Sequence, residues 1–150
     1  MAVRRAGEPL AYEPLLEESR AALDAAEIDV LKSAGGLRVP LSNEPRREIV
    51  DLVADLSLPA LVVARSGLGT LNHTALTVEA LRGRDVDVLG VALNRYGDDS
   101  VAERTNPDEL ERMCGCPVGT LPKMALDDRR AHGALVDELP HKRMGEELPL

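Results

Sequence analysis

The chain has 150 residues, a formal net charge of −8 and 44% hydrophobic residues. Its length suits a single domain with a sizeable core, and that core must be aliphatic because the sequence contains no Phe or Trp and only two Tyr. The negative charge argues against nucleic acid or an anionic membrane as a partner, since no basic stripe is present to meet phosphates. No apolar run is long enough to span a membrane, and the first residues lack the apolar centre of a signal peptide, so we expect a cytoplasmic protein.

The first half of the chain is predicted to form two helices and two strands. Apolar residues recur at helical spacing over Glu13–Ala26 and again over Arg46–Leu56. Each helix is followed by a short apolar run that is typical of a buried strand, Ile28–Lys32 after the first and Pro59–Ala64 after the second.

The second half continues the alternation of strands and helices. Helical spacing predicts a helix over Leu71–Arg82, and the apolar run Val86–Asn94 predicts the next strand. Asn106 is predicted to cap a further helix, because Pro and acidic residues follow it in what would be the first turn. Pro117–Leu121 is predicted as a fourth short strand and Leu126–Leu139 as a last helix.

This order of elements predicts an α/β domain with about four parallel strands and helices on both faces of the sheet. The domain is expected to cover residues 1–139, with a flexible tail at 140–150. Ligands of such sheets bind at the carboxyl ends of the strands. Three loops rich in small or polar residues follow predicted strands, and we expect them to lie along one edge of the sheet: Ser33–Gly36, Arg65–His73 and Asn94–Asp99.

The stretch Leu58–Thr74 is the most informative part of the sequence. It reads LPALVVARSGLGTLNHT, an apolar β-branched run followed by a turn with Gly67 and Gly69 and then by a helix start. Glycines let the chain turn without Cβ clashes, and the first amide groups of a helix can take an anion. By shape alone, however, an ordinary connection between a strand and a helix has the same pattern.

Cys114 and Cys116 form a single C-x-C pair. A zinc site needs about four ligands, the chain has no second pair of cysteines, and His132 and His141 are the only later histidines. We therefore expect two buried or half-exposed thiols rather than a metal site.

Four segments of the chain resemble dethiobiotin synthetases and occur in the order found in that family. The resemblance covers about residues 12–125 and rests on SAGGLRVPL (33–41), LPALVVARSGLGTLNHT (58–74), GVALN (90–94) and PVGTLP (117–122). It implies a P-loop NTPase-like domain that lacks the N-terminal phosphate-loop strand. It also implies a role in biotin biosynthesis, since these enzymes use ATP, Mg²⁺ and CO₂ to close a ureido ring on 7,8-diaminononanoate and generally act as homodimers.

The resemblance also assigns residues to the two ligands. The turn that begins the helix after Gly67 would bind the substrate carboxylate across the dimer interface, and its members are Leu68, Gly69, Thr70, Leu71 and Asn72. A helix N-terminus with small residues and an Asn donor suits a carboxylate. Asn94 matches the residue that reads the adenine edge, and Leu121 and Pro122 match a segment that lines the same base pocket. Without the resemblance, Asn94 is equally well explained as a turn residue at the end of a strand.

Two departures from the family pattern concern the phosphates. The G-x-x-x-x-G-K-[ST] motif is missing, since the only glycine before Gly35 is Gly7, which no Lys-Ser or Lys-Thr pair follows. Lys32 stands where the family has a glutamate that ligates Mg²⁺, and a cation cannot ligate a cation. Lys32 would instead reach a phosphate as a point charge or have a different local role. We therefore assign no catalytic residue and no metal ligand, and expect no turnover by this polypeptide alone.

Three explanations of this pattern stay open: a truncated gene product, one subunit of a split enzyme, and a degenerate binding or scaffold module. The expected partners are a second copy of the chain or a complementary subunit that carries the phosphate loop, together with a small-molecule carboxylate. The alternative function is a non-catalytic module that uses the same sheet to dimerise or to bind a small carboxylate.

Overall fold

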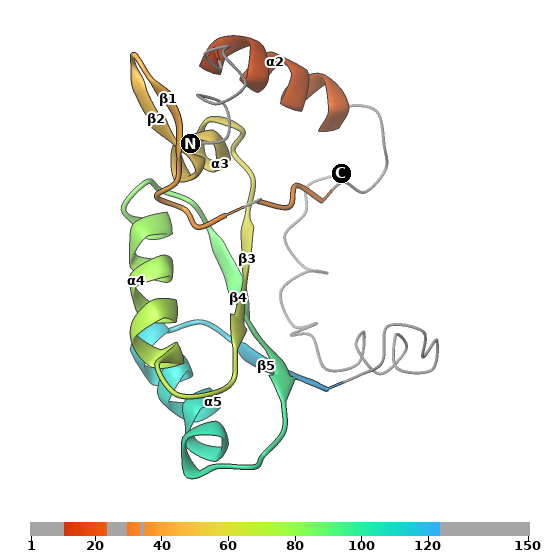
Figure 1. Ribbon diagram of the computed structural model, residues 1–150, viewed down its shortest axis with the longest axis vertical. Coiled ribbons are helices and arrows are strands. Elements are labelled where there is room, and N and C mark those ends of the chain that lie inside the picture. The colour runs from red at the N-terminus through yellow and green to blue at the C-terminus, as the bar shows by residue number, and fades with distance from the viewer. Residues whose placement is uncertain (1–10, 24–29, 34, 124–150) are drawn as a thin grey trace. The chain divides into compact units, whose positions relative to one another are not determined.

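The computed structural model describes residues 11–23, 30–33 and 35–123 (Figure 1). Contacts divide the chain into two units. The first comprises Met1–Leu58 with Arg84–Val86, and the second comprises Pro59–Gly83 with Asp87–Leu150.

The first unit has a small apolar core between two helices. Helix α2 (Tyr12–Leu23) and helix α3 (Ile49–Asp55) meet through Tyr12, Leu16 and Leu52, which are all buried. The Tyr12 hydroxyl donates a 2.7 Å hydrogen bond to Asp55, so the start of one helix is joined to the end of the other. This agrees with the predicted helix over Glu13–Ala26 as far as residue 23, since Ala26 lies outside the described residues.

A hairpin in the first unit was missed by the sequence analysis. Strands β1 (Pro40–Asn43) and β2 (Arg46–Glu48) pair antiparallel, so the helix predicted from Arg46 was wrong over its first three residues. The Glu48 carboxylate is buried and lies 2.8 Å from the Arg38 guanidinium and 2.9 Å from that of Arg46. Pairing with β1 holds the chain extended up to Glu48, which caps α3.

The strand predicted at Ile28–Lys32 is also wrong for its described part. Val30, Leu31 and Lys32 are exposed and belong to no strand, whereas Ile28 and Asp29 lie outside the described residues. An apolar run of this length forms a strand only where a neighbouring strand can pair with it.

The second unit is a three-stranded parallel sheet. Its elements follow one another as β3 (Ala60–Arg65), α4 (Thr70–Arg82), β4 (Val88–Tyr96), α5 (Val101–Cys114) and β5 (Val118–Pro122), and the strands lie in the order β3-β4-β5. The predicted α/β class with a parallel sheet is confirmed. Among the described residues the parallel sheet has three strands rather than about four.

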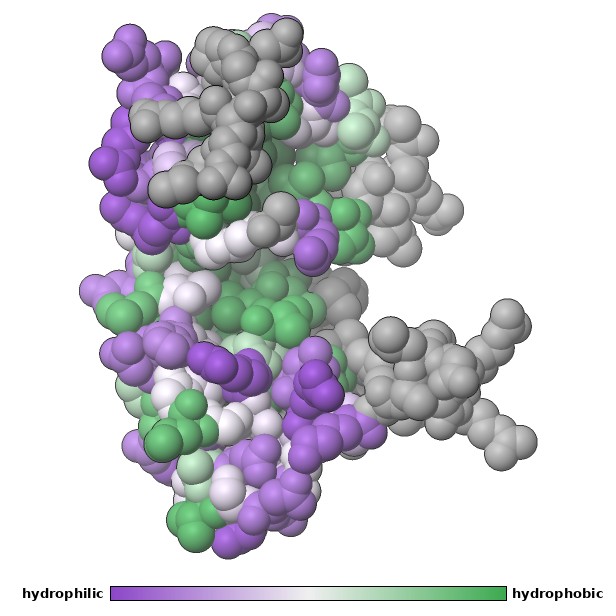
Figure 2. Space-filling view, viewed as in Figure 1, coloured by the Kyte–Doolittle hydropathy of each residue, from purple (hydrophilic) through white to green (hydrophobic). Residues whose placement is uncertain are grey.

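The two helices of this unit pack against each other and lie on the same side of the sheet (Figure 1). On the helix side Val62 pairs in register with Val91, and these residues are 9% and 0% exposed. Val63 points to the opposite side and is 61% exposed. Figure 2, drawn from the same side as Figure 1, shows apolar surface over the region of β3 and β4. Residues 59–123 therefore cover one face of the sheet with helices and supply none for the other face.

The predicted helix start at Asn106 was wrong. Helix α5 begins at Val101, and Ser100 caps it by accepting a 3.2 Å hydrogen bond from the amide of Glu103. Asn106 and Pro107 lie inside the helix. The capping pattern of Ser followed three residues later by Glu is the stronger helix-start signal, and the Asn106 side chain is engaged elsewhere.

Two predictions fall on residues that the structure does not describe. These are the helix at Leu126–Leu139 and the tail at 140–150. Within the described part of the chain, no helix has the length and apolar character needed to cross a membrane.

Candidate functional site

The turn between β3 and α4 has the geometry that the glycine pattern predicts. Gly69 is the N-cap of α4 and has a φ of +90°. This left-handed conformation is open to glycine and strained for residues with a Cβ. Ser66, which follows β3 directly, is only 4% exposed, whereas Leu68 at the tip of the turn is 90% exposed. The turn is thus anchored at its start and open to solvent at its tip.

The first amides of α4 are only partly available to a ligand. The Thr70 amide donates to the Gly67 carbonyl at 3.2 Å, and the His73 amide donates to the Gly69 carbonyl at 3.3 Å. No hydrogen bond between described residues engages the amides of Leu71 or Asn72. Of the first amide groups of α4, only those of Leu71 and Asn72 are therefore open to an anion.

The five residues assigned to the carboxylate differ in their accessibility. Asn72 is exposed and Leu71 is half-buried, so both can approach a ligand. Thr70 is 1% exposed, and its hydroxyl lies 3.2 Å from that of Thr74. Its side chain therefore holds the first turn of α4 together and does not face solvent.

The residues assigned to adenine lie together at the carboxyl ends of two strands. Asn94 pairs in register with Leu121, and Tyr96 pairs with Pro122. Asn94 and Pro122 are exposed, whereas Leu121 is buried. Arg65 at the end of β3 is the partner of Asn94 on its other side, so the loops after β3 and β4 are neighbours at this edge, as expected.

The segment after Asn94 has an unusual backbone and an ion pair. Arg95 and Asp98 have positive φ values of 59° and 56°, a conformation uncommon for residues other than glycine. Lys123, directly after β5, lies 2.9 Å from the Asp99 carboxylate, and this hydrogen bond and the charge of Asp99 raise the pKa of Lys123. The pair ties the loop after β4 to the end of β5.

A partly buried polar network that the sequence pattern does not predict joins the two loops. The Ser66 hydroxyl donates to the Glu103 carboxylate at 2.9 Å, and the Asn106 amide donates to the Ser66 carbonyl at 2.7 Å. The hydrogen bond from Ser66, followed by those from the Asp99 amide and the Ser100 hydroxyl, lowers the pKa of Glu103. The capping pattern at Ser100 would have placed Glu103 and Asn106 on the first turns of α5, but not their contacts with Ser66.

The third loop, Ser33–Gly36, belongs to the first unit. Its Ser33 hydroxyl accepts a 3.2 Å hydrogen bond from the Gly35 amide, and Lys32 before it is exposed. The described residues before it form no strand, so the expectation that all three loops follow strands is correct only for the loops after β3 and β4.

The Mg²⁺ ligand that the resemblance implies is absent from its expected position. The described part of the chain holds no group of three His, Cys, Asp or Glu side chains that could ligate a metal, and Lys32 brings a positive charge to the position of the expected ligand.

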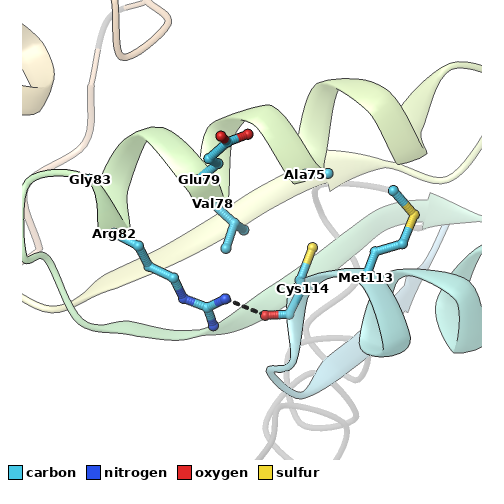
Figure 3. A pocket seen from close by; sticks show the side chains of 7 residues that line it. All are labelled: Ala75, Val78, Glu79, Arg82, Gly83, Met113 and Cys114. Carbon is cyan, nitrogen blue, oxygen red and sulfur yellow. Dashed lines mark hydrogen bonds between the residues drawn. The ribbon is translucent and has the colours of Figure 1, made fainter.

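Cys114 and Cys116 are both buried, as expected, and both are free thiols. Burial raises the pKa of each thiol, so they are held in the protonated, unreactive form. Cys114 also lines an open cavity of about 530 Å³ between α4 and α5 (Figure 3). Arg82 crosses this cavity to donate a hydrogen bond to the Cys114 carbonyl. The cavity lies at the carboxyl end of α4, away from Gly69.

Parallel strands, crossover helices and a glycine turn at a helix N-terminus are the features of a P-loop NTPase-like α/β protein. The family described as an AAA domain matches residues 6–129. The chain is 53% identical over 121 residues to the ATP-dependent dethiobiotin synthetase BioD of Haloferax mediterranei, covering 81% of this chain and 51% of that protein. It is 45% identical over 123 residues to the synthetase of Anaeromyxobacter sp. (strain K), covering 81% and 54%, and 34% identical over 121 residues to that of Bacillus subtilis (strain 168), covering 79% and 52%.

The chain belongs to the dethiobiotin synthetase family, within the AAA-domain family that its sequence matches. It spans about half the length of the curated relatives that it matches.

Proposed function

We propose that this chain is a dethiobiotin synthetase-like protein of biotin biosynthesis that supplies the substrate-carboxylate part and the adenine part of a ring-closing site. In the reaction that the family resemblance implies, ATP and Mg²⁺ drive ureido ring closure of 7,8-diaminononanoate with CO₂. The relatives named above are called ATP-dependent, which supports ATP as the nucleotide.

The observation that carries this proposal is the turn at Gly69. Its left-handed backbone presents the amides of Leu71 and Asn72 at the head of α4, together with the exposed Asn72 side chain. Amide donors at the positive end of a helix dipole suit a carboxylate. The terminus alone contributes only about 0.3–1 kcal/mol at an exposed site, so binding without the nucleotide is expected to be weak.

The adenine part rests on Asn94, Leu121 and Pro122. The exposed amide of Asn94 can donate to and accept from the edge of a base. Pro122 is exposed on the neighbouring strand end and supplies apolar surface for the face of the ring, whereas Leu121 beside it is buried.

The phosphate part is missing from these 150 residues. None of the three lysines, Lys32, Lys123 and Lys142, follows a glycine, so no G-x-x-x-x-G-K-[ST] motif is present. Phosphoryl transfer depends on groups that position and neutralise the phosphates. These 150 residues are therefore proposed to be incomplete as a catalyst by themselves. Their proposed partner is a second copy of the chain or a complementary polypeptide that carries the phosphate loop, in the cytoplasm.

The same absence favours one alternative function. With Lys32 in place of a metal ligand and no phosphate loop, the sheet would serve as a non-catalytic module that dimerises or binds a small carboxylate. The two functions differ in the nucleotide, because only the first requires ATP to bind at Asn94.

Titration calorimetry with spectral mapping tests the proposal. The chain is titrated with 7,8-diaminononanoate, with ATP–Mg²⁺ and with both, and amide chemical shifts are recorded for each ligand. A vicinal diamine of the same length without the carboxylate serves as the control. We expect shifts within residues 66–74 for diaminononanoate, none there for the control diamine, and shifts around Asn94 and Pro122 for ATP.

The outcomes separate the two functions. Diaminononanoate shifts that cluster away from residues 66–74 would refute the carboxylate site. Carboxylate binding without any response to ATP would support the non-catalytic module instead.

A further inference from the structure

Asn106 lies in the middle of α5, yet its side chain reaches out of the helix to the turn before α4. It is 4% exposed, and its amide nitrogen lies 2.7 Å from the Ser66 carbonyl and 3.5 Å from the Gly67 carbonyl. Because a side-chain amide carries two N–H groups, it can serve both carbonyls. These two carbonyls belong to the first residues after β3, where the chain turns toward Gly69.

The sequence Asn106-Pro107 is unfavourable inside a helix. Pro107 has no amide hydrogen to donate within the helix, and proline disfavours the helical conformation of the residue before it. A sequence that breaks a local rule without a local gain points to a role in a site. Here the gain is the pair of contacts that Asn106 makes with the turn.

Glu103, one turn earlier on α5, holds the same turn from a second side. One of its carboxylate oxygens accepts the Ser66 hydroxyl at 2.9 Å. The other accepts the Asp99 amide at 3.1 Å and the Ser100 hydroxyl at 3.3 Å. Glu103 therefore joins the turn after β3 to the loop after β4.

Ser66 is also close to the residue that follows Asn94. Its hydroxyl lies 3.3 Å from the Arg95 carbonyl, and Arg95 has the positive φ of 59° noted above. The side chains of Ser66 and Asn106, which are buried, and of Glu103, which is half-buried, thus contact the backbone on both sides of the candidate site. None of the three belongs to the residues assigned to a ligand.

We infer that Asn106, Glu103 and Ser66 are positioning residues that hold the turn Ser66–Gly69 and the segment after Asn94 in one arrangement. The carboxylate donors at the head of α4 and the adenine-reading Asn94 are then set together by side chains that touch neither ligand. The ligands named here rest on the proposed function, whereas the positioning itself does not.

The test compares the parent chain with two variants and two matched controls. Asn106→Ala removes both contacts with the turn. Ser66→Ala removes a single hydroxyl, and it tests the positioning role even if Asn106→Ala fails to fold. Thr105→Ala is the neighbouring control, since its hydroxyl bonds only carbonyls within α5. Val78→Ala is the stability control, because this side chain is 2% exposed and lies two turns beyond Gly69 on α4.

Two measurements are made on each chain: the amide resonances of the free protein and the affinity for 7,8-diaminononanoate. In Asn106→Ala and in Ser66→Ala we expect the resonances of residues 67–72 and of residues 95–98 to move together. We also expect the affinity to fall by about fivefold, the equivalent of one hydrogen bond. Thr105→Ala and Val78→Ala leave both segments and the affinity of the folded protein unchanged.

The outcomes distinguish this inference from the proposed function. If the parent binds diaminononanoate and Ser66→Ala binds it equally well with both segments unmoved, the positioning role is refuted and the proposed function stands. If the parent binds no diaminononanoate, the proposed function fails, and the joint movement of the two segments alone decides the positioning role. Movement confined to residues 67–72 would also refute the link to Asn94.

Discussion

Gly69 and Gly67 lie two residues apart in the same turn, but their backbones differ. Gly69 has a φ of +90°, whereas Gly67 has no such value and a Cβ added to it would meet nothing within 4 Å. A side chain at a left-handed position costs about 1–2 kcal/mol, and β-branched residues tolerate it least. The conformation, rather than the space, makes glycine necessary at position 69.

We therefore expect Gly69→Val to lower the free energy of unfolding by about 2 kcal/mol and to weaken carboxylate binding, while Gly67→Ala changes neither. Urea unfolding and titration with diaminononanoate measure the two effects. Equal behaviour of the two variants would mean that Gly69 is not needed in the left-handed conformation.

Asn72 is exposed at the head of α4, so its side chain is expected to matter for binding and not for folding. Asn72→Ala should weaken the binding of diaminononanoate by up to about tenfold, because it removes one donor to a charged group, with the unfolding curve unchanged. His73→Ala, at the next exposed position, is the control. If the two substitutions have the same effect on affinity, Asn72 does not contact the carboxylate.

At the scale of the element, the N-terminus of α5 is expected to be sensitive to pH through Glu103. The hydrogen bond from Ser66 is the main cause that lowers its pKa below the usual value of 4.5, aided by the Asp99 amide and the Ser100 hydroxyl. A carboxyl whose pKa is lower in the folded state stabilises the fold fully above its unfolded pKa. That contribution declines as the pH falls through the folded value.

The free energy of unfolding of the parent should therefore decrease as the pH is lowered below about 4.5, and Glu103→Gln should remove part of this dependence. Urea unfolding at a series of pH values measures it. Glu109→Gln serves as the control, because it removes a carboxylate that lies on the same helix but pairs with Arg112 instead of Ser66. A pH profile that Glu103→Gln leaves intact would show that the contacts of this carboxylate contribute nothing to stability.

At the scale of the whole molecule, the sheet is expected to make the isolated chain associate. Strand β3 pairs only with β4 among the described strands, and on the face without described helices Leu61 and Val63 are 43% and 61% exposed. An unpaired strand edge beside apolar surface favours pairing with another chain.

We expect light scattering to detect a dimer or a larger assembly, and Val63→Lys to shift it toward the monomer. Leu76→Lys, which places the same charge at a 55% exposed position on α4, is the control. A parent chain that stays monomeric at high concentration would contradict this prediction and the family-type dimer.

The isolated chain is further expected to show no ATP-dependent ring closure, because the groups that hold the terminal phosphate are missing from its sequence. The assay contains diaminononanoate, bicarbonate, ATP and Mg²⁺, with contaminating full-length enzyme excluded. Addition of a separate phosphate-loop polypeptide from the same source should restore turnover if the chain is one part of a split enzyme. Turnover by the chain alone would refute its incompleteness.

Elements with local sequence signals could be predicted from the amino-acid sequence. The strands at β3, β4 and β5 and helix α4 were predicted to within two residues at each end, because apolar runs and helical spacing report burial directly. The turn at Gly69 and the neighbouring strand ends at Asn94 and Leu121 could also be predicted, because the carboxyl ends of parallel strands meet at one edge of the sheet.

Features that depend on contacts with other elements could be seen only in the folded chain. Arg46–Glu48 forms a strand because it pairs antiparallel with Pro40–Asn43, although its helical spacing predicted a helix. Asn106 resembled a helix cap in sequence, but it is bonded to a carbonyl 40 positions away in the chain. A side chain that satisfies a backbone group on another element leaves no local pattern, so the network behind the candidate site could be found only once the fold had brought its members together.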